Sequence, residues 1–139
     1  DFKILFDKNV FENVALSFQV LELPLKKIKN EVNQALALVG LEEKKYFFPI
    51  QLSVGELQRV AIARSILGNR EIILADEPTG NLDPKTSWEI MRLFKKISLN
   101  KTVIIATHNE EIVNSFQKRV IGLKDGRLLK DEKKGRYSL

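Results

Sequence analysis

The stretch from Ile72 to Asp83 constrains the fold of this chain more than any other. Four apolar residues, Ile72–Ala75, run into the adjacent carboxylates Asp76 and Glu77, and a turn rich in Pro, Gly and Asn follows. A short apolar run bounded by turn residues predicts a buried strand, as in parallel sheets covered on both faces. The acids then lie at the carboxyl end of the strand, where α/β sheets bind ligands. Paired carboxylates in a buried place are costly unless a cation or a proton transfer uses them. A metal–nucleotide site is therefore predicted, with a solvent-facing strand end as the alternative.

The composition fits one globular domain. The chain has 139 residues, of which 44% are hydrophobic and 29% charged, and it has no cysteine to build a disulfide framework. No apolar run approaches the length that spans a bilayer. The net charge of +5 comes in part from basic residues near the end of the chain: Lys130, Lys133, Lys134 and Arg136. A loose, solvated basic tail is favoured over a nucleic-acid or membrane surface.

Two amphipathic helices are predicted ahead of the first strand. The first covers Asn9–Leu23, with Asn9 and Glu12 as a cap pair, and the second covers Leu25–Val39 and stops at Gly40. The apolar positions at helical spacing are Phe11, Val14, Ala15, Phe18 and Leu21 in the first, and Leu25, Ile28, Val32, Ala35, Leu36 and Val39 in the second. Two such helices with no strand between them indicate a small helical lobe.

A third helix is predicted to begin at Ser53 and to end near Gly68. Ser53 and Glu56, three residues apart, form a capping box. The start of a helix presents free backbone N–H groups and the positive end of the helix dipole, and both attract phosphate. Gly55 in the first turn would let a ligand approach the backbone closely. An ordinary capped helix is the alternative.

Strands and helices alternate in the rest of the chain. Asp83-Pro84 predicts a helix start, Thr102–Ala106 predicts a second apolar strand, and Asp125-Gly126 predicts a hairpin turn. This order indicates parallel α/β organisation behind the helical lobe. His108, the only histidine, follows the second strand directly. A lone histidine is more often structural, but one beside an acid-bearing strand end is a candidate catalytic residue.

Four motifs together resemble the ABC-type ATPases. Leu52-Ser53-Val54-Gly55-Glu56 is similar to the signature loop, Ile72–Glu77 to the Walker B strand with its catalytic glutamate, Gly80–Asp83 to the D-loop, and His108 to the switch histidine. They stand in the order and spacing of that family. The resemblance implies an α/β, P-loop NTPase-like ABC ATPase fold in which a helical subdomain precedes parallel strands and a C-terminal hairpin. It implies a helical signature subdomain at residues 1–67, part of the ATPase core at 68–130 and a polar basic tail at 131–139.

The resemblance also implies roles for these residues and a need for ATP and Mg²⁺. Asp76 would hold Mg²⁺ through water, Glu77 would polarise the attacking water, and His108 would contact the γ-phosphate. Ser53, Val54, Gly55 and Glu56 would bind the nucleotide of a second subunit in a head-to-tail dimer. Asp83 would couple the two sites across the dimer interface.

Two departures from the family pattern stand out. Val54 takes the place of the first glycine of the signature. We expect this difference to have little effect on the function of the loop. No G-x-x-x-x-G-K-[ST] sequence occurs, so the phosphate cradle and its lysine are absent from these 139 residues. We therefore expect a C-terminal piece, truncated at the N-terminus, of an ATPase whose full-length form hydrolyses ATP. The 139 residues alone are expected to be inactive.

The finer resemblance is to the FtsE type of cell-division ATP-binding proteins, carried by Asp1-Phe2-Lys3, Arg119-Val120-Ile121 and residues 131–137. It implies an FtsX-like permease as partner, a homodimer of ATPase subunits, and a peripheral place at the cytoplasmic face of a bacterial membrane. ATPases of lipoprotein-release and macrolide exporters are the alternative. Tyr46, Phe47 and Phe48 are either contacts for the permease or part of the lobe core.

Two hypotheses belong to other classes. In the first, the chain is a non-catalytic interaction module. Glu77 and His108 argue against it, since a docking module has no use for either. In the second, the basic residues bind nucleic acid. They are scattered, without the interleaved aromatic residues of single-strand binders, so no nucleic-acid partner is predicted.

Overall fold

The computed structural model describes residues 2–19, 23–68 and 70–137. The chain divides into two compact units, Asp1–Ile105 and Ala106–Leu139. These units do not coincide with the boundaries at residues 67 and 130 that the family resemblance implies, so that domain division stays a prediction.

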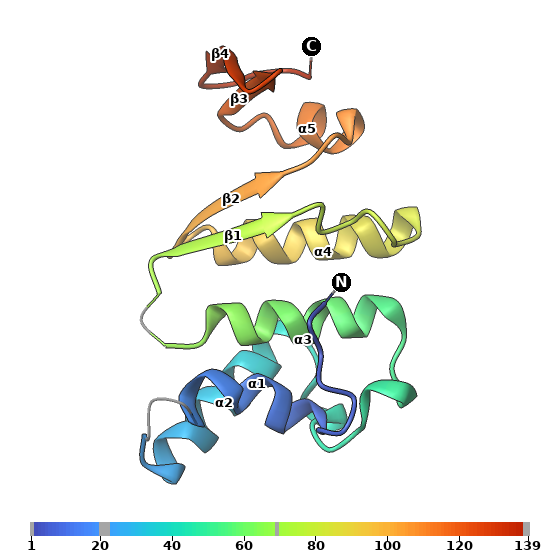
Figure 1. The fold of residues 1–139 in the computed structure, drawn as a ribbon, viewed down its shortest axis with the longest axis vertical. Helices are drawn as coiled ribbons and strands as arrows, with labels where there is room; N and C mark the ends of the chain where they lie inside the picture. The colour runs from blue at the N-terminus through green and yellow to red at the C-terminus, as the bar shows by residue number, and fades with distance from the viewer. Residues whose placement is uncertain (1, 20–22, 69, 138–139) are drawn as a thin grey trace. The chain divides into compact units, whose positions relative to one another are not determined.

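The first unit begins with a helical lobe. Its elements are α1 (Val10–Gln19), α2 (Leu25–Val39), the short 3-10 turns η1 (Glu42–Lys44) and η2 (Pro49–Gln51), and α3 (Val54–Ile66) (Figure 1). Asn9 and Glu12 form the predicted cap, each side chain accepting the backbone N–H of the other at 2.9 Å. Gly40 ends α2 with a φ of 73°, a left-handed conformation that suits glycine. Leu21 of the predicted first helix lies outside the described residues.

The lobe packs around a continuous apolar core. Its fully buried side chains include Val10, Val14, Val32, Leu36, Val39 and Val60. Asn13 on α1 is also fully buried, at 0% exposure. Its side chain accepts from the backbone N of Leu5 at 2.9 Å and lies within hydrogen-bonding distance of the carbonyls of Leu5, Lys8 and Asn9. The loop that leads into α1 is therefore pinned to the helix by one polar side chain.

An α/β segment follows α3. It consists of β1 (Ile72–Asp76), α4 (Pro84–Ile97) and β2 (Thr102–Ala106), and the two strands pair in a two-stranded sheet. Figure 1 draws both arrows in the same direction, as predicted for strands joined by a helical crossover. Asp83 caps α4 and Pro84 opens it, as predicted. The buried side of α4 includes Met91, Leu93, Phe94 and Ile97, and Trp88 on the same helix is half-buried.

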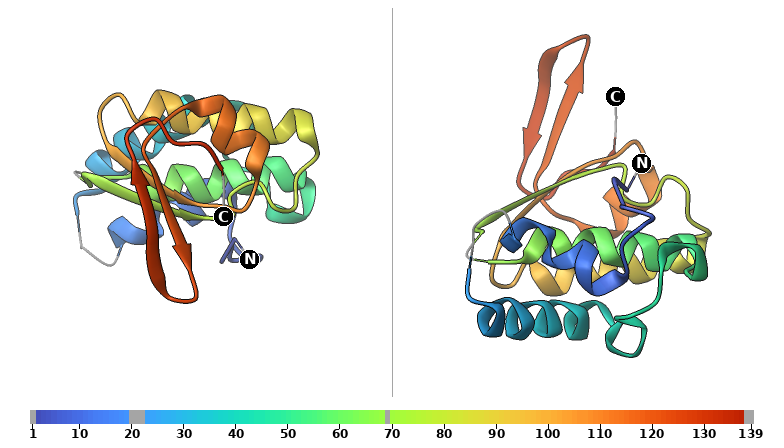
Figure 2. Two further views of the ribbon diagram at one scale, coloured as in Figure 1. Left: turned by 90° about the horizontal axis from the view of Figure 1, so that it is seen from above. Right: turned by 60° about the horizontal axis from the view of Figure 1, so that its bottom comes forward.

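The prediction that the first strand is covered on both faces is wrong for this chain. Ile73 is buried at 3% exposure, but its neighbours Ile72 and Leu74 are 58% and 75% exposed, and Ile104 on β2 is 53% exposed. Successive side chains of a strand point to opposite faces. The helix α4 covers one face of the sheet (Figures 1 and 2), and the other face presents apolar side chains to solvent.

We expect the 139 residues expressed alone to self-associate through this open sheet face, because contiguous exposed apolar surface drives association. Leu74→Lys should shift the chain towards the monomer in light scattering. Leu25→Lys is the matched control, because Leu25 on α2 is equally apolar and 83% exposed but isolated from the sheet. A wild-type chain that stays monomeric and melts in one sharp transition would contradict the expectation.

The second unit holds α5 (Glu110–Phe116) and an antiparallel hairpin of β3 (Val120–Lys124) and β4 (Arg127–Glu132). Asp125 and Gly126 form the predicted turn, with φ values of 49° and 72° that fit a type I′ hairpin. The sequence predicts a loose tail after Lys130. Instead β4 continues to Glu132, Gly135 N donates to the Lys118 carbonyl at 3.2 Å, and Tyr137 N donates to Asn114 Oδ1 at 2.8 Å. That expectation is wrong for residues 131–137.

Within the part of the chain that the structure describes, no helix has both the length and the apolar character needed to cross a bilayer.

Candidate nucleotide site

The predicted signature loop is a capped helix start. Ser53 is the N-cap of α3: its hydroxyl accepts from Glu56 N at 3.3 Å, and its own N–H donates to Glu56 Oε2 at 2.9 Å. Val54 is 47% exposed at the first helical position. This reciprocal pairing fixes the first turn, so the remaining N–H groups point outward from a rigid helix end.

Glu56 is tied to a second segment. Its Oε1 lies 2.6 Å from Nζ of Lys44, at the end of the 3-10 turn η1. The hydrogen bond from Lys44, followed by those from Ser53, holds the pKa of Glu56 below its usual value despite partial burial, which opposes the shift. The capping box is therefore anchored to the loop that carries the exposed residues Tyr46, Phe47 and Phe48.

This lowered pKa predicts a pH dependence of stability. A carboxyl whose folded pKa is depressed contributes stability above its unfolded pKa, and the contribution is lost as pH falls through the folded value. We therefore expect the free energy of unfolding to fall as the pH drops below about 4.5, the ordinary value for Glu56. Glu56→Gln should flatten this part of the profile in denaturant titrations at several pH values. Glu43→Gln, at an exposed position on the same loop, is the control, and an equal flattening by both variants would contradict the assignment.

Gly55 is buried, and the absence of a side chain there leaves space for the methyl group of Thr86. A Cβ at position 55 would stand 2.5 Å from Cγ2 of Thr86, in the first turn of α4. Packing of α3 against the Thr86 side chain thus favours glycine here, independently of any ligand, because a Cβ would make Thr86 turn or the helices shift. The predicted role of Gly55 towards a nucleotide stays a prediction.

The two acids lie at the end of β1, as the sequence predicts. Asp76 is the last residue of the strand and is exposed, and Glu77 is half-buried. The prediction that both acids lie in a buried place is therefore wrong, because one face of the strand is open. Glu77 has a φ of 42°, a left-handed conformation that is uncommon for residues other than glycine. Such strain is concentrated at functional sites.

A small pocket of about 70 Å³ adjoins the acids. Its lining residues come from the start of the chain, from α3 and from the turn after β1: Phe2, Gln58, Asp76, Glu77, Pro78, Gly80, Asn81 and Leu82. A water molecule occupies about 30 Å³ in the liquid, so the pocket has room for one or two waters and not for a nucleotide.

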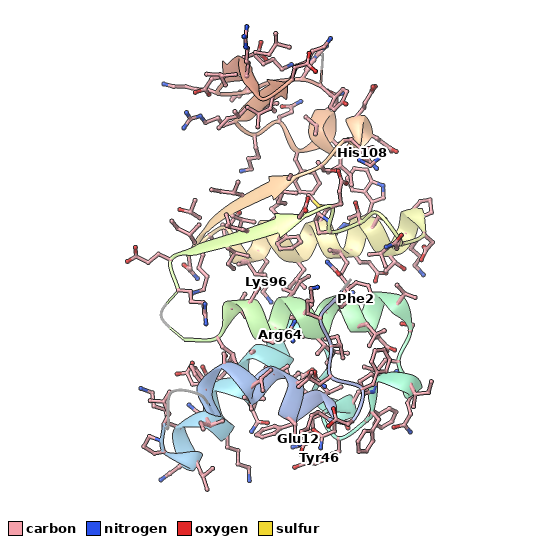
Figure 3. All side chains as sticks on the ribbon, viewed as in Figure 1. Phe2, Glu12, Tyr46, Arg64, Lys96 and His108 are labelled. Carbon is pink, nitrogen blue, oxygen red and sulfur yellow. The ribbon has the colours of Figure 1, made fainter. Side chains whose placement is uncertain are left out.

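Arg64 on α3 holds one wall of this pocket. Its guanidinium donates to the carbonyls of Phe2 and Lys3, both at 2.8 Å, and burial lowers its pKa. Figure 3 labels Arg64 and Phe2. This contact is not predictable from the sequence, because hydrogen bonds to backbone atoms about 60 residues away leave no local pattern.

The donor set fits a magnesium ion held mainly by water and phosphate. Among the described residues, no three His, Cys, Asp or Glu side chains gather as a metal-binding cluster. Mg²⁺ keeps several waters and is commonly held by one or two carboxylates together with substrate phosphates. The exposed carboxylate of Asp76 meets that need.

Asp83 caps α4, as its position before Pro84 predicts. Its Oδ1 accepts from Thr86 N at 3.0 Å, and its Oδ2 accepts from the Thr86 hydroxyl. These bonds, the hydroxyl first, hold the pKa of Asp83 below its usual range, so the side chain stays a carboxylate.

His108 belongs to the second unit, where it is exposed in the segment between β2 and α5. It is labelled in Figure 3. The predicted place of His108 beside the acids of the first unit stays a prediction from the sequence.

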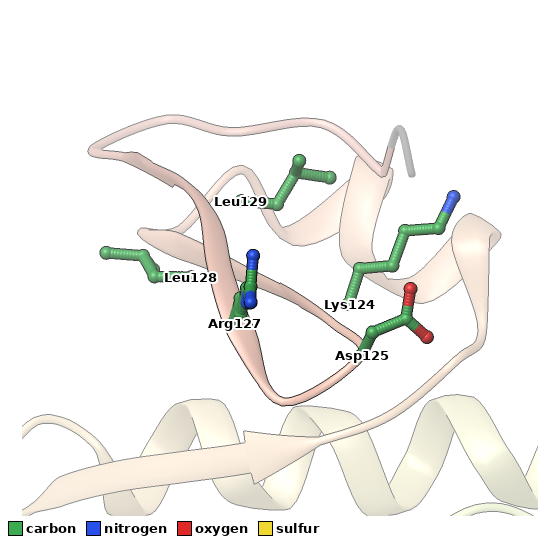
Figure 4. Close-up of a pocket in the computed structure, with 5 residues that line it drawn as sticks. All are labelled: Lys124, Asp125, Arg127, Leu128 and Leu129. Atoms are coloured by element: carbon green, nitrogen blue, oxygen red, sulfur yellow. The ribbon is translucent and has the colours of Figure 1, made fainter.

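A wider hollow of about 540 Å³ lies on the hairpin of the second unit (Figure 4). It is lined by Lys124, Asp125, Arg127, Leu128 and Leu129. These residues come from one exposed turn and its flanks, and they include none of the predicted site residues. The hollow is therefore no candidate for the nucleotide site.

Comparison with known proteins identifies the family. The model of the family described as ABC transporter matches residues 2–80, more than half of the chain. The chain belongs to the ABC transporter family. It is 49% identical over 138 residues to the cell division ATP-binding protein FtsE of Streptococcus pneumoniae D39, and 51% identical over 138 residues to that of Bacillus subtilis 168. In both cases the match covers 99% of this chain and 60% of the relative, so the chain spans less than two thirds of their length.

Solved structures agree with this assignment. The chain matches cbiO1 from Clostridium perfringens, described as part of the ABC transporter complex cbiONQ, with a TM-score of 0.86 and 32% identity, over 94% of this chain and 53% of that one. It matches the ATP-binding cassette MJ0796, described as a dimer bound to ADP and Pi, with a TM-score of 0.79 and 36% identity, over 98% and 61% of the two chains. The predicted ABC ATPase fold is confirmed.

Proposed function

We propose that these residues form the signature-bearing part of an ATP-hydrolysing subunit of an ABC-type membrane complex, of the FtsE kind in cell division. The observation that carries the proposal is that one compact unit holds a rigid, capped helix start at Ser53 and a strained glutamate, Glu77, beside a water-sized pocket.

In this proposal each residue has a separate task. Asp76 holds Mg²⁺ through water, and the ion, when bound, neutralises charge on the phosphates. Glu77 orients and polarises the attacking water. His108 contacts the γ-phosphate as its charge develops.

The signature residues act on the neighbouring subunit. Ser53, Val54, Gly55 and Glu56 bind the γ-phosphate of a nucleotide held by a second copy in a head-to-tail dimer, with the N–H groups of α3 as donors. Asp83 couples the two sites. The dimeric cassette among the structural relatives supports this arrangement.

The partner is a permease of the FtsX kind, and the subunit lies at the cytoplasmic face of a bacterial membrane. Tyr46, Phe47 and Phe48 are exposed, which favours a docking role over a role in the lobe core. A methionine importer or a lipoprotein or macrolide exporter is the second candidate. The importer is supported by relatives named methionine import ATP-binding protein MetN, such as the one from Helicobacter acinonychis at 41% identity.

The test is ATP hydrolysis by the full gene product, with and without Mg²⁺, followed by co-purification of the permease from membranes. Mg²⁺-dependent hydrolysis and recovery of an integral membrane permease are expected. A full gene product that binds a partner but never hydrolyses ATP would refute the proposal in favour of a non-catalytic module.

A further inference from the structure

Thr86, in the first turn of α4, touches both the signature loop and the D-loop acid of its own chain. We propose that Thr86 is a positioning residue that fixes the signature loop and Asp83 relative to one another, so that both engage a neighbouring subunit as one rigid block. This inference rests on the proposed function.

The hydroxyl and the backbone of Thr86 hold Asp83. The hydroxyl donates to Asp83 Oδ2, and the backbone N–H donates to Asp83 Oδ1 at 3.0 Å. Both carboxylate oxygens are therefore bound from one residue, and the side chain of Asp83 has a single defined orientation.

The methyl group of Thr86 faces the signature loop. Its Cγ2 lies 2.5 Å from the position that a Cβ on Gly55 would occupy, so glycine and threonine fit together as a matched pair. Real Cβ atoms do not approach other atoms this closely, so Gly55→Ala must push α3 and α4 apart or turn the Thr86 side chain away from Asp83.

A second contact joins the same two helices about one turn further along. Arg59 stands four residues after Gly55, and Glu89 stands three residues after Thr86, so each lies on the same face of its helix as the first pair. Arg59 Nη2 and Glu89 Oε2 are 3.0 Å apart, and Arg59 Nη1 donates to the Val39 carbonyl at 2.9 Å. Two points of contact fix the relative orientation of two helices far better than one.

The functional consequence follows from where the two motifs act. In the proposed dimer, Ser53 and Asp83 both contact the neighbouring subunit, and neither holds the nucleotide bound by its own subunit. Loosening the contact between α3 and α4 should therefore slow turnover and weaken ATP-driven dimerisation, while ATP binding to the monomer is unchanged.

The test uses the full gene product with four variants: Gly55→Ala, Thr86→Ser, Thr86→Val and the double variant Gly55→Ala/Thr86→Ser. Serine keeps the hydroxyl that binds Asp83 and removes the methyl group. Valine keeps a methyl group against Gly55 and removes the hydroxyl. Thr102→Ser, at an exposed position on β2, is the matched control. For each protein we would measure kcat, the Kd of the monomer for ATP, the dimer fraction with ATP, and the melting temperature.

We expect Gly55→Ala to lower kcat by about tenfold or more, and Thr86→Ser to restore it to within about threefold of wild type by removing the clash. Thr86→Val should lower kcat without changing the Kd of the monomer for ATP.

If the serine substitution fails to rescue Gly55→Ala, glycine is needed for the ligand alone, and the inference is overturned. Changes in melting temperature with constant kcat would overturn it as well, since they indicate a merely structural contact. A wild-type protein without ATP hydrolysis would instead refute the proposed function and this inference with it.

Discussion

Glu77→Gln in the full gene product is expected to lower ATP turnover by a factor of about 10² or more while ATP binding persists, as for the loss of a general base. The amide has the shape of the carboxylate but no longer accepts a proton. Glu77 follows the exposed Asp76 and adjoins a pocket with room for one or two waters, which suits a residue that orients an attacking water.

The measurement is steady-state hydrolysis alongside equilibrium binding of ATP to the same preparation. Glu71→Gln is the matched control. Glu71 is exposed just before β1, so the substitution makes the same chemical change outside the pocket. Hydrolysis that persists in Glu77→Gln, or an equal loss in Glu71→Gln, would refute the role assigned to Glu77.

Asn13→Ala is expected to lower the free energy of unfolding by about 3 kcal/mol, because three hydrogen bonds from the Asn13 side chain are lost and each contributes about 1 kcal/mol. Alanine would leave Leu5 N and the carbonyls of Leu5 and Lys8 without the partner that Asn13 supplies. The loop before α1 would then lose its anchor to the helix.

The free energy of unfolding of the full gene product, from denaturant titration, checks this expectation. Asn30→Ala, at an exposed position on α2, makes the same substitution without burial and should stay within about 0.5 kcal/mol of wild type. Asn13→Asp keeps the acceptor for Leu5 N and loses the donors, so it should also destabilise. Equal stability of Asn13→Ala and Asn30→Ala would contradict the role of Asn13.

The features that the sequence predicted correctly depend on neighbours in the chain. The cap pairs at Asn9 and Ser53, the Asp83-Pro84 helix start and the Asp125-Gly126 turn each reside within four residues. Their geometry is set by local backbone hydrogen bonds, so a short pattern is enough to predict them.

The contacts that escaped prediction join distant parts of the chain. The bonds from Arg64 to Phe2 and Lys3, the Arg59–Glu89 ion pair and the fit of Thr86 against Gly55 depend on how helices pack. The apolar run at Ile72–Ala75 predicted a strand correctly but not its exposure. Burial depends on what covers each face of a sheet, and the run itself carries no information about that.

The backbone of Glu77 has a consequence for selection experiments. A left-handed φ of 42° is comfortable for Gly or Asn and costs other residues about 1 kcal/mol. At position 77 the backbone conformation therefore favours Gly or Asn, whereas the proposed reaction needs the carboxylate of Glu. A library selected for thermal stability alone is expected to enrich Gly or Asn at this position, while a library selected for growth that depends on turnover should retain Glu.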